Sequence, residues 1–163
     1  MEIRGEGLRL RPLETDDAAA VASGLNDPDC ARFMPSIPSP YTSADAEAWV
    51  EHCAYVWRTG ESWPFAILDA ETDEFLGSIE LHHGTATVGY WVASTARGRG
   101  IATHALRLIC RETSARPLRL TTHPDNLASQ RVAQKAGFER IGTTSDHPVF
   151  RDGTCDAALF ELA

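Results

Sequence analysis

The segment Arg97-Gly98-Arg99-Gly100 combines the residue types of an anion-binding loop. It follows a strand-like apolar segment, residues 87–93, and leads into residues 100–114, whose apolar side chains recur at helical spacing. Glycines let successive backbone N–H groups point inward, and the start of a helix adds unpaired N–H donors with partial positive charge. The two arginines could add charge-assisted bonds to phosphate. This pattern favours a pyrophosphate site, and the alternative is a tight glycine turn with solvated arginines.

Two common nucleotide-binding motifs match this loop poorly. A Walker P-loop would need a Gly-Lys-Ser/Thr sequence, which is absent. The dinucleotide fingerprint is nearly present, with Gly98 and Gly100, but its third glycine position holds Thr103. The acidic residue expected beyond the next strand is represented only by the nearby Asp125. A dinucleotide-binding oxidoreductase therefore stays open as an alternative.

Four titratable residues are candidates for a general base: Glu80, His82, His123 and His147. Glu80 and His82 share one face of a predicted strand, and His123 follows another strand directly. A histidine is attractive because its ordinary pKa lies near working pH. The adjacent pair His82-His83 points to opposite faces of its strand, so we expect no metal site there.

Hydrophobic periodicity and turn residues predict the helices and strands around these residues. A helix with Thr15 as N-cap should run to Leu25, and another should lie between a capping box at Thr42 and Asp45 and a terminal Gly60. Residues 34–41 hold three prolines and predict an irregular loop with exposed apolar side chains. Further helices are predicted at 100–114 and 126–136, and strands at 8–13, 63–68, 75–81, 87–93, 118–122, 138–143 and 154–162. Residues 87–122 then form a strand–helix–strand unit with a right-handed crossover.

Length and composition describe a globular chain with an acidic balance. The 163 residues fit one domain spanning 1–163 and carry a formal net charge of −8. This charge suits a cationic partner such as an amine, or serves solubility alone, and it argues against general nucleic-acid binding. No membrane-length apolar run or signal peptide is visible, so we expect a cytoplasmic protein without membrane association. Its four cysteines, Cys30, Cys53, Cys110 and Cys155, are expected to be reduced.

Several motifs in order along the chain resemble the GNAT N-acyltransferase superfamily. Residues 97–102 match its Arg/Gln-x-x-Gly-x-Gly/Ala acyl-CoA motif. The RimJ/RimL branch is further suggested by the N-terminal Leu-Arg-Leu-Arg-Pro-Leu, Gly89-Tyr90-Trp91, Asn126-x-x-Ser129, Lys135-Ala136-Gly137-Phe138 and Phe150-Arg151-Asp152-Gly153. That branch acetylates N-termini of ribosomal proteins, and many of its relatives act on other amines.

The resemblance implies an α/β fold: a single GNAT-type domain whose mixed, mostly antiparallel sheet carries helices on both faces and a central strand–loop–helix–strand acyl-CoA unit. It implies acetyl transfer from acetyl-CoA to a primary amine by direct attack in a ternary complex, with no metal. A peptide or protein N-terminus is favoured over a small amine as acceptor. The residues that would contact the cofactor are Tyr90, Trp91, Val92, Arg97, Gly98, Arg99, Gly100, Ile101, Ala102, Thr103, Asn126 and Ser129.

The sequence departs from the superfamily at its usual acid and base positions. Ala133 stands where many members have a general-acid tyrosine, and Thr121 stands where many have a glutamate. The RimJ/RimL resemblance makes Ser129 the candidate proton donor to the thiolate, although a serine near a helix start can also be a cap. Glu80 and His123 are the two favoured bases. The missing tyrosine keeps a non-catalytic acyl-CoA sensor open as an alternative.

The acceptor would enter against the apolar loop and the turn after residue 80. Phe33, Met34 and Tyr41 are the predicted lining residues. The same apolar loop could instead be a packing lid or the contact of a homodimer.

Overall fold

The computed structural model describes residues 1–163, whose eight strands form one sheet in the order β1-β2-β3-β4-β5-β6-β8-β7. The strands are β1 (Ile3–Gly5), β2 (Leu8–Pro12), β3 (Ser62–Asp69), β4 (Phe75–His82), β5 (Thr87–Val92), β6 (Leu118–Thr122), β7 (Glu139–Thr144) and β8 (Ala157–Leu162). The helices are α1 (Ala18–Leu25), α2 (Pro28–Phe33), α3 (Ser43–Thr59), α4 (Ile101–Glu112) and α5 (Leu127–Lys135). Two 3₁₀ turns, η1 (Thr15–Asp17) and η2 (Ser94–Ala96), precede α1 and α4. None of these helices has the length and apolar character needed to span a membrane.

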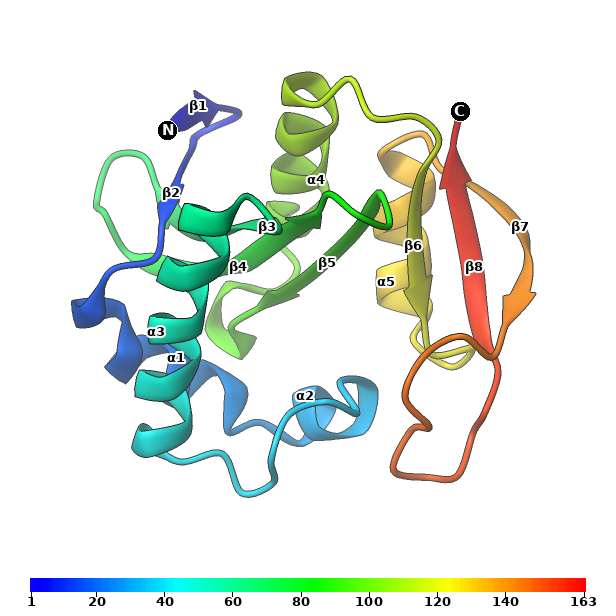
Figure 1. Cartoon of the computed structure of the whole chain (residues 1–163), viewed down its shortest axis with the longest axis horizontal. Helices are drawn as coiled ribbons and strands as arrows, with labels where there is room; N and C mark the ends of the chain where they lie inside the picture. The colour runs from blue at the N-terminus through cyan, green and yellow to red at the C-terminus, as the bar shows by residue number, and fades with distance from the viewer.

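The only parallel neighbours in the sheet are β5 and β6, which α4 connects as a crossover. Their pairing is a single register pair, Thr87 with Arg119, at the start of each strand. In Figure 1 the two strands lie together at that end and separate toward their other ends. All the other neighbouring strands are antiparallel, so the predicted mixed, mostly antiparallel sheet is confirmed.

Two hydrophobic clusters hold helices against opposite faces of the sheet. The first packs α4 and α5 through residues such as Leu106, Ile109 and Ala133. The second packs α1 and α3 through residues such as Val21 and Val50. Successive side chains of β5 point to opposite faces of the sheet. Tyr90 and Val92 therefore pack against the first cluster, and Trp91 belongs to the second. The predicted helices on both faces are thus confirmed.

The start of the first helical segment differs from the expectation. Glu14, not Thr15, is the N-cap: its side chain and that of Asp17 make a capping box around η1. Asp17 is buried, and its carboxylate accepts two bonds from Arg11, at 2.7 and 2.9 Å. Asp17 therefore ties this turn to β2.

The structure also contains two elements that the sequence analysis did not predict, β1 and α2. Strand β1 forms a tight hairpin with β2 through Glu6 and Gly7, both at positive φ. Helix α2 begins with Pro28 in its first turn and is capped by Asp27, whose carboxylate accepts from the Cys30 N–H at 3.2 Å. It lies below the gap between β5 and β6 (Figure 1). The predicted irregular loop is therefore shorter at its start and follows a helix.

Candidate functional site

The separation of β5 from β6 leaves one edge of β5 without a strand partner. At the end of β5, the Ala93 N–H bonds to the Leu76 carbonyl of β4 at 2.8 Å. The N–H and C=O groups of the odd-numbered residues of β5 therefore point to β4, and those of the even-numbered residues point away from it. Those of Tyr90 and Val92 therefore point into the gap. Of the three residues expected to offer backbone groups to a pantetheine arm, Tyr90 and Val92 direct theirs into the gap and Trp91 directs its own toward β4. Such an open edge can accept an extended ligand as an added strand.

The loop after β5 brings the start of α4 to this gap. Gly98 and Gly100 have φ of +76° and +78°, in the left-handed region that favours glycine. The first helical N–H with a backbone partner is that of His104, which bonds to the Gly100 carbonyl at 3.0 Å. The N–H groups of residues 101–103 therefore stay available at the positive end of the helix dipole. This is the predicted anion-binding geometry.

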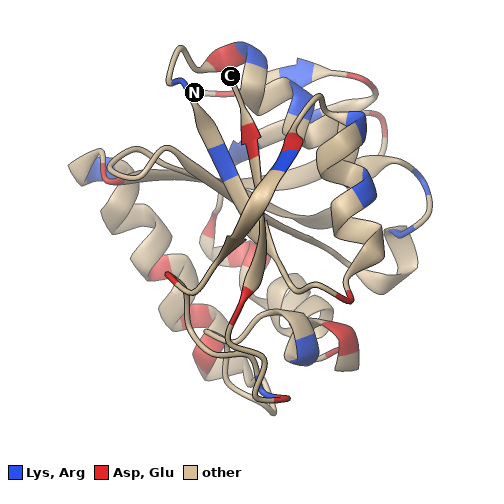
Figure 2. Ribbon diagram, turned by 90° about the vertical axis from the view of Figure 1, so that its right-hand side faces the viewer, with Lys and Arg blue, Asp and Glu red and all other residues tan.

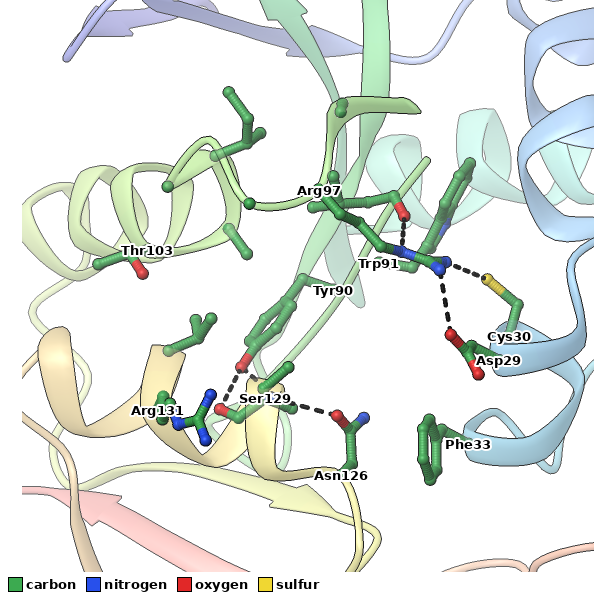
Figure 3. A pocket seen from close by; sticks show the side chains of 18 of the residues that line it. Asp29, Cys30, Phe33, Tyr90, Trp91, Arg97, Thr103, Asn126, Ser129 and Arg131 are labelled. Carbon is green, nitrogen blue, oxygen red and sulfur yellow. Dashed lines mark hydrogen bonds and ion pairs between the residues drawn. The ribbon is translucent and has the colours of Figure 1, made fainter. Parts of the chain in front are cut away.

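The two loop arginines turn away from this helix start. Arg97 pairs with Asp27 at 2.7 Å and with Asp29 at 3.3 Å, and its Nε donates to the Val92 carbonyl at 3.2 Å (Figure 3). Arg99 lies 3.7 Å from Asp69 at the end of β3. Carboxylates distant in sequence thus hold both side chains, while Arg97 also lines the cavity, and bonds of these arginines to phosphate stay a prediction.

Two cations that were not among the predicted cofactor residues face the same cavity. Arg131 and Lys135, one turn apart on α5, line it opposite the start of α4. Neither side chain takes part in an ion pair or hydrogen bond within the chain, and both residues are exposed. The sequence offered a signal for this pair: Arg131 and Lys135 follow the Asn126-x-x-Ser129 motif and are four residues apart, which puts both on one helix face. They can offer uncompensated positive charge to a phosphate ligand.

A network of polar side chains joins β5 to the first turn of α5. The Asn126 side chain caps α5 by accepting from the Ser129 N–H at 3.1 Å, so Ser129 is not the cap. The Ser129 hydroxyl instead lies 3.0 Å from the Tyr90 hydroxyl, and the Ser129 carbonyl accepts from Tyr90 at 3.2 Å (Figure 3). Burial raises the pKa of Tyr90 to about 12, so its hydroxyl stays protonated at physiological pH. All three residues line the cavity.

His123 is buried beside the cavity, with both ring nitrogens engaged. Its Nδ1 accepts from the Asp125 N–H at 3.0 Å, so the ring proton lies on Nε2, which donates to Asp152 at 2.8 Å. The ring packs between Phe33 and Phe150, with centroids at 5.3 and 4.6 Å. Bonds from the Thr154 backbone and side chain, with a further one from His123, lower the pKa of Asp152 to about 2. His123 does not line the cavity, and this arrangement leaves it no free nitrogen to accept a proton.

Glu80 lies in a different hollow from the loop–helix site. Its Oε1 accepts from the Ser62 hydroxyl at 2.5 Å and lies 3.6 Å from Nδ1 of His82. These three residues line a second cavity of about 280 Å³ on the α3 side of the sheet. Next to Glu80 in the sheet stands Gly89, which is exposed and has open space where a side chain would be. The other predicted base candidate, His147, bonds to the Pro148 carbonyl at 2.7 Å.

The predicted acceptor-lining residues divide between the cavity and the core. Phe33 and Met34 line the main cavity. Tyr41 does not: it is 7% exposed and packs in the cluster under α1 and α3 instead of at the cavity. The chain after Phe33 is held by Arg151, which donates to the carbonyls of Ala31, Met34 and Ile37. One wall of the cavity is therefore fixed by the β7–β8 loop.

Together these elements line a cavity of about 450 Å³ that is open to solvent and has mainly hydrophobic lining residues. It runs from Arg131 and Lys135, past the start of α4 and the open edge of β5, to Phe33 on α2 (Figure 3). An anion-binding helix start, free strand-edge groups and a buried hydroxyl pair suit a long ligand with phosphates at one end and a reactive group at the other.

Comparison with known proteins supports this assignment. Residues 7–139 match the model of the acetyltransferase (GNAT) domain family. The "Probable N-acetyltransferase YjcK" of Bacillus subtilis (strain 168) is 28% identical over 86% of this chain and 84% of its own. The "Uncharacterized N-acetyltransferase p20" of Bacillus licheniformis is 24% identical over 96% of this chain and 93% of its own.

Solved structures share the fold at lower identity. RimJ of Mycobacterium smegmatis, in complex with CoA-disulfide, has a TM-score of 0.82 at 23% identity, covering 99% of this chain and 85% of its own. RimL, the ribosomal L7/L12 α-N-protein acetyltransferase in complex with coenzyme A, has a TM-score of 0.86 at 18% identity, covering 99% and 97%. Since the family model spans most of the chain and the fold agrees, this protein belongs to the GNAT acetyltransferase family.

Proposed function

We propose that this enzyme transfers an acetyl group from acetyl-CoA to a primary amine, with a peptide or protein N-terminus favoured over a small amine. The observation that carries the proposal is the open edge of β5 beside the free N–H groups at the start of α4. In this proposal the backbones of Tyr90 and Val92 bind the pantetheine arm, and residues 98–103 bind the pyrophosphate. Arg131 and Lys135 add positive charge.

The favoured acceptor is supported by the cavity's second end and by the fold. Phe33 and Met34 offer an apolar wall at that end. RimL and RimJ, which share the fold, are named as ribosomal-protein acetyltransferase and as a CoA-binding relative.

Acetyl transfer needs a neutral amine, a polarised carbonyl and a protonated leaving thiolate, and residues of this chain can serve each need. Because its backbone points into the gap, the Val92 N–H is placed to donate to the carbonyl oxygen. Asn126 holds the first turn of α5 so that Ser129 can donate to the sulfur. Holding both substrates in one cavity supplies much of the rate.

Glu80 is the favoured base, acting through water, because His123 has no free nitrogen. The carboxylate of Glu80 keeps unused acceptor capacity beyond its bond from Ser62. Gly89 beside it leaves room for water or for the acceptor. A base can act through one intervening water, so Glu80 need not line the main cavity.

A charge placed at the start of α4 tests the proposed cofactor site. Ala102 lines the cavity in the first turn of α4, where a glutamate suits both the helix and its dipole. We therefore expect Ala102→Glu to fold normally and to lose acetyl-CoA and CoA binding by calorimetry, because its carboxylate repels the pyrophosphate. Ala102→Ser is the matched control and should keep the affinity. Unchanged binding in Ala102→Glu would contradict the site.

The wild-type protein separates the alternatives. An acetyltransferase should gain thermal stability with acetyl-CoA and CoA and should acetylate some amine in a screen of peptides and small amines. A ligand at ~100 times its Kd stabilises a fold by roughly 2.7 kcal/mol. A sensor would show the same shift without turnover, and an oxidoreductase would respond to NADH and not to CoA.

A further inference from the structure

The partly buried hydroxyl of Tyr90 meets the hydroxyl of Ser129. Two hydroxyl groups from different elements meet in the main cavity, 39 residues apart in sequence. The Tyr90 oxygen lies 3.0 Å from Ser129 Oγ and 3.2 Å from the Ser129 carbonyl oxygen. In Figure 3 the Tyr90 ring points across the cavity to the first turn of α5. The contact is therefore directed at one residue.

Resting on the proposed function, we propose that Tyr90 is a positioning residue that holds the Ser129 hydroxyl ready to donate to the sulfur of the cofactor. A serine hydroxyl has one proton and two lone pairs, and it rotates to suit its partners. When Tyr90 donates its proton to Ser129 Oγ, that oxygen is an acceptor on one side. Its own proton is then left to point into the cavity.

The surroundings of the pair support this direction of donation. The Ser129 N–H is already bonded to the Asn126 side chain, so the backbone of this turn is fixed. Burial keeps the Tyr90 hydroxyl protonated and able to donate. Tyr90 has a single proton and two acceptors within reach, and Ser129 Oγ at 3.0 Å is nearer than the Ser129 carbonyl at 3.2 Å.

The pair also accounts for the residue at the superfamily's usual acid position. Ala133 stands there, one helical turn beyond Ser129, and is fully buried. A hydroxyl cannot come from this position of α5. Strand β5 supplies it instead from the opposite wall, through the side chain of Tyr90. The site thereby keeps a phenol hydroxyl, beside Ser129, although the helix lacks one.

The proton balance of the step needs no further reactant. The amine nitrogen forms a bond to the acetyl carbon as the carbon–sulfur bond breaks, and the electron pair stays on sulfur. Ser129 donates its proton to sulfur and regains one from the amine by way of the base and water. The net change moves one proton from nitrogen to sulfur, and Tyr90 keeps its own.

Three variants test the proposal by kinetics. Ser129→Ala should lower kcat about 100-fold, within the range of general-acid contributions. Tyr90→Phe, which keeps the ring, should lower kcat about tenfold with an unchanged Kd for acetyl-CoA. In the double variant, Tyr90→Phe should cost nothing further, because the group it positions is gone. Tyr55→Phe on the exposed part of α3 is the control and should keep wild-type kcat.

A second readout does not depend on turnover. The thiol pKa of bound CoA can be followed by the ultraviolet absorbance of its thiolate. A donor at the sulfur lowers a thiol pKa, whose ordinary value is about 8.5. We expect both Tyr90→Phe and Ser129→Ala to raise it relative to the wild type, and Tyr55→Phe to leave it unchanged.

The outcomes separate this inference from the proposed function. If wild-type protein binds CoA and acetylates amines while Tyr90→Phe matches it in kcat and thiol pKa, the positioning role is wrong and the function stands. Additive losses in the double variant would also overturn the role. A wild type that neither binds CoA nor turns over would overturn the function itself.

Discussion

At the scale of single residues, the two favoured bases differ in what their atoms are already doing. His123 accepts a backbone N–H at Nδ1 and donates to Asp152 at Nε2, so it holds the β6–α5 turn to the β7–β8 loop. Glu80 uses one bond, from Ser62. A residue whose hydrogen bonds are complete is suited to structure, and one with free lone pairs can still take a proton.

This difference predicts opposite effects of two substitutions. Glu80→Gln should lower kcat about 100-fold and leave the melting temperature near that of wild type, because the amide can still accept from Ser62. His123→Asn should lower stability by about 1–3 kcal/mol, since it loses the bond to Asp152 and ring packing, and should change kcat only a few-fold. Steady-state kinetics and thermal unfolding measure both. A large loss of kcat in a stable His123→Asn protein would reverse the assignment.

Residue contacts of this kind were only partly predictable from the sequence. The chemical types were visible in the motifs, and the structure brings Ser129, Asn126 and Tyr90 together in one cavity as expected of cofactor-site residues. Their partners were not visible, because the Tyr90–Ser129 contact and the Arg97–Asp27 pair join segments 39 and 70 residues apart. Local patterning carries no information on such pairing.

At the scale of elements, the sequence suggested that the β5–α4 loop supplies free positive charge to the site. In the structure the free cations come from α5, and the loop arginine Arg97 is paired. The loop arginine Arg97 closes a contact between β5 and α2, where its partner Asp27 is mostly buried. The guanidinium and the backbone bond from Cys30 lower the pKa of the Asp27 carboxyl against the opposing effect of burial. Arg131 and Lys135 remain free beside the cavity.

We therefore expect opposite results from charge removal in these two elements. Arg97→Ala should lower the melting temperature and leave the Kd for acetyl-CoA within a few-fold of wild type. Arg131→Ala and Lys135→Ala should leave the melting temperature unchanged and each weaken acetyl-CoA binding about tenfold, as loss of a charge-assisted bond worth about 1.5 kcal/mol implies. Calorimetry and thermal unfolding provide both quantities. A tenfold weaker Kd in Arg97→Ala alone would return the phosphate contact to the loop.

The elements themselves were mostly predicted, and the exceptions have physical reasons. Every long periodic segment appears as the expected helix or strand within a few residues of its predicted bounds. Helix α2 was missed because its six residues are too few to show a period, and Pro28 resembles the end of the previous helix. Asp27 followed by Pro28 was a usable signal, since a capping aspartate before proline at the first position is typical of a helix start.

At the scale of the whole molecule, charge divides between the two halves of the chain. Residues 1–96 hold 5 basic and 16 acidic residues, a net charge of −11, while residues 97–163 hold 10 basic and 7 acidic, a net charge of +3. Figure 2 shows acidic positions along the helices of the lower part and basic ones around α4 and α5. The net charge of −8 is therefore divided unevenly along the chain. The cavity end formed by the start of α4, Arg131 and Lys135 lies in the positive half.

The acidic half should select among acceptors by their charge. Two peptides with the same N-terminal residue, one with lysines and one with glutamates in the next positions, should differ about tenfold in kcat/KM at low salt, with the lysine peptide faster. Because the Debye length falls from about 30 Å at 0.01 M to 10 Å at 0.1 M ionic strength, the ratio should shrink as salt rises. The KM for acetyl-CoA should rise with salt over the same range, since an anion meets the positive half. Equal rates for the two peptides at low salt would show that the charge division does not reach the acceptor.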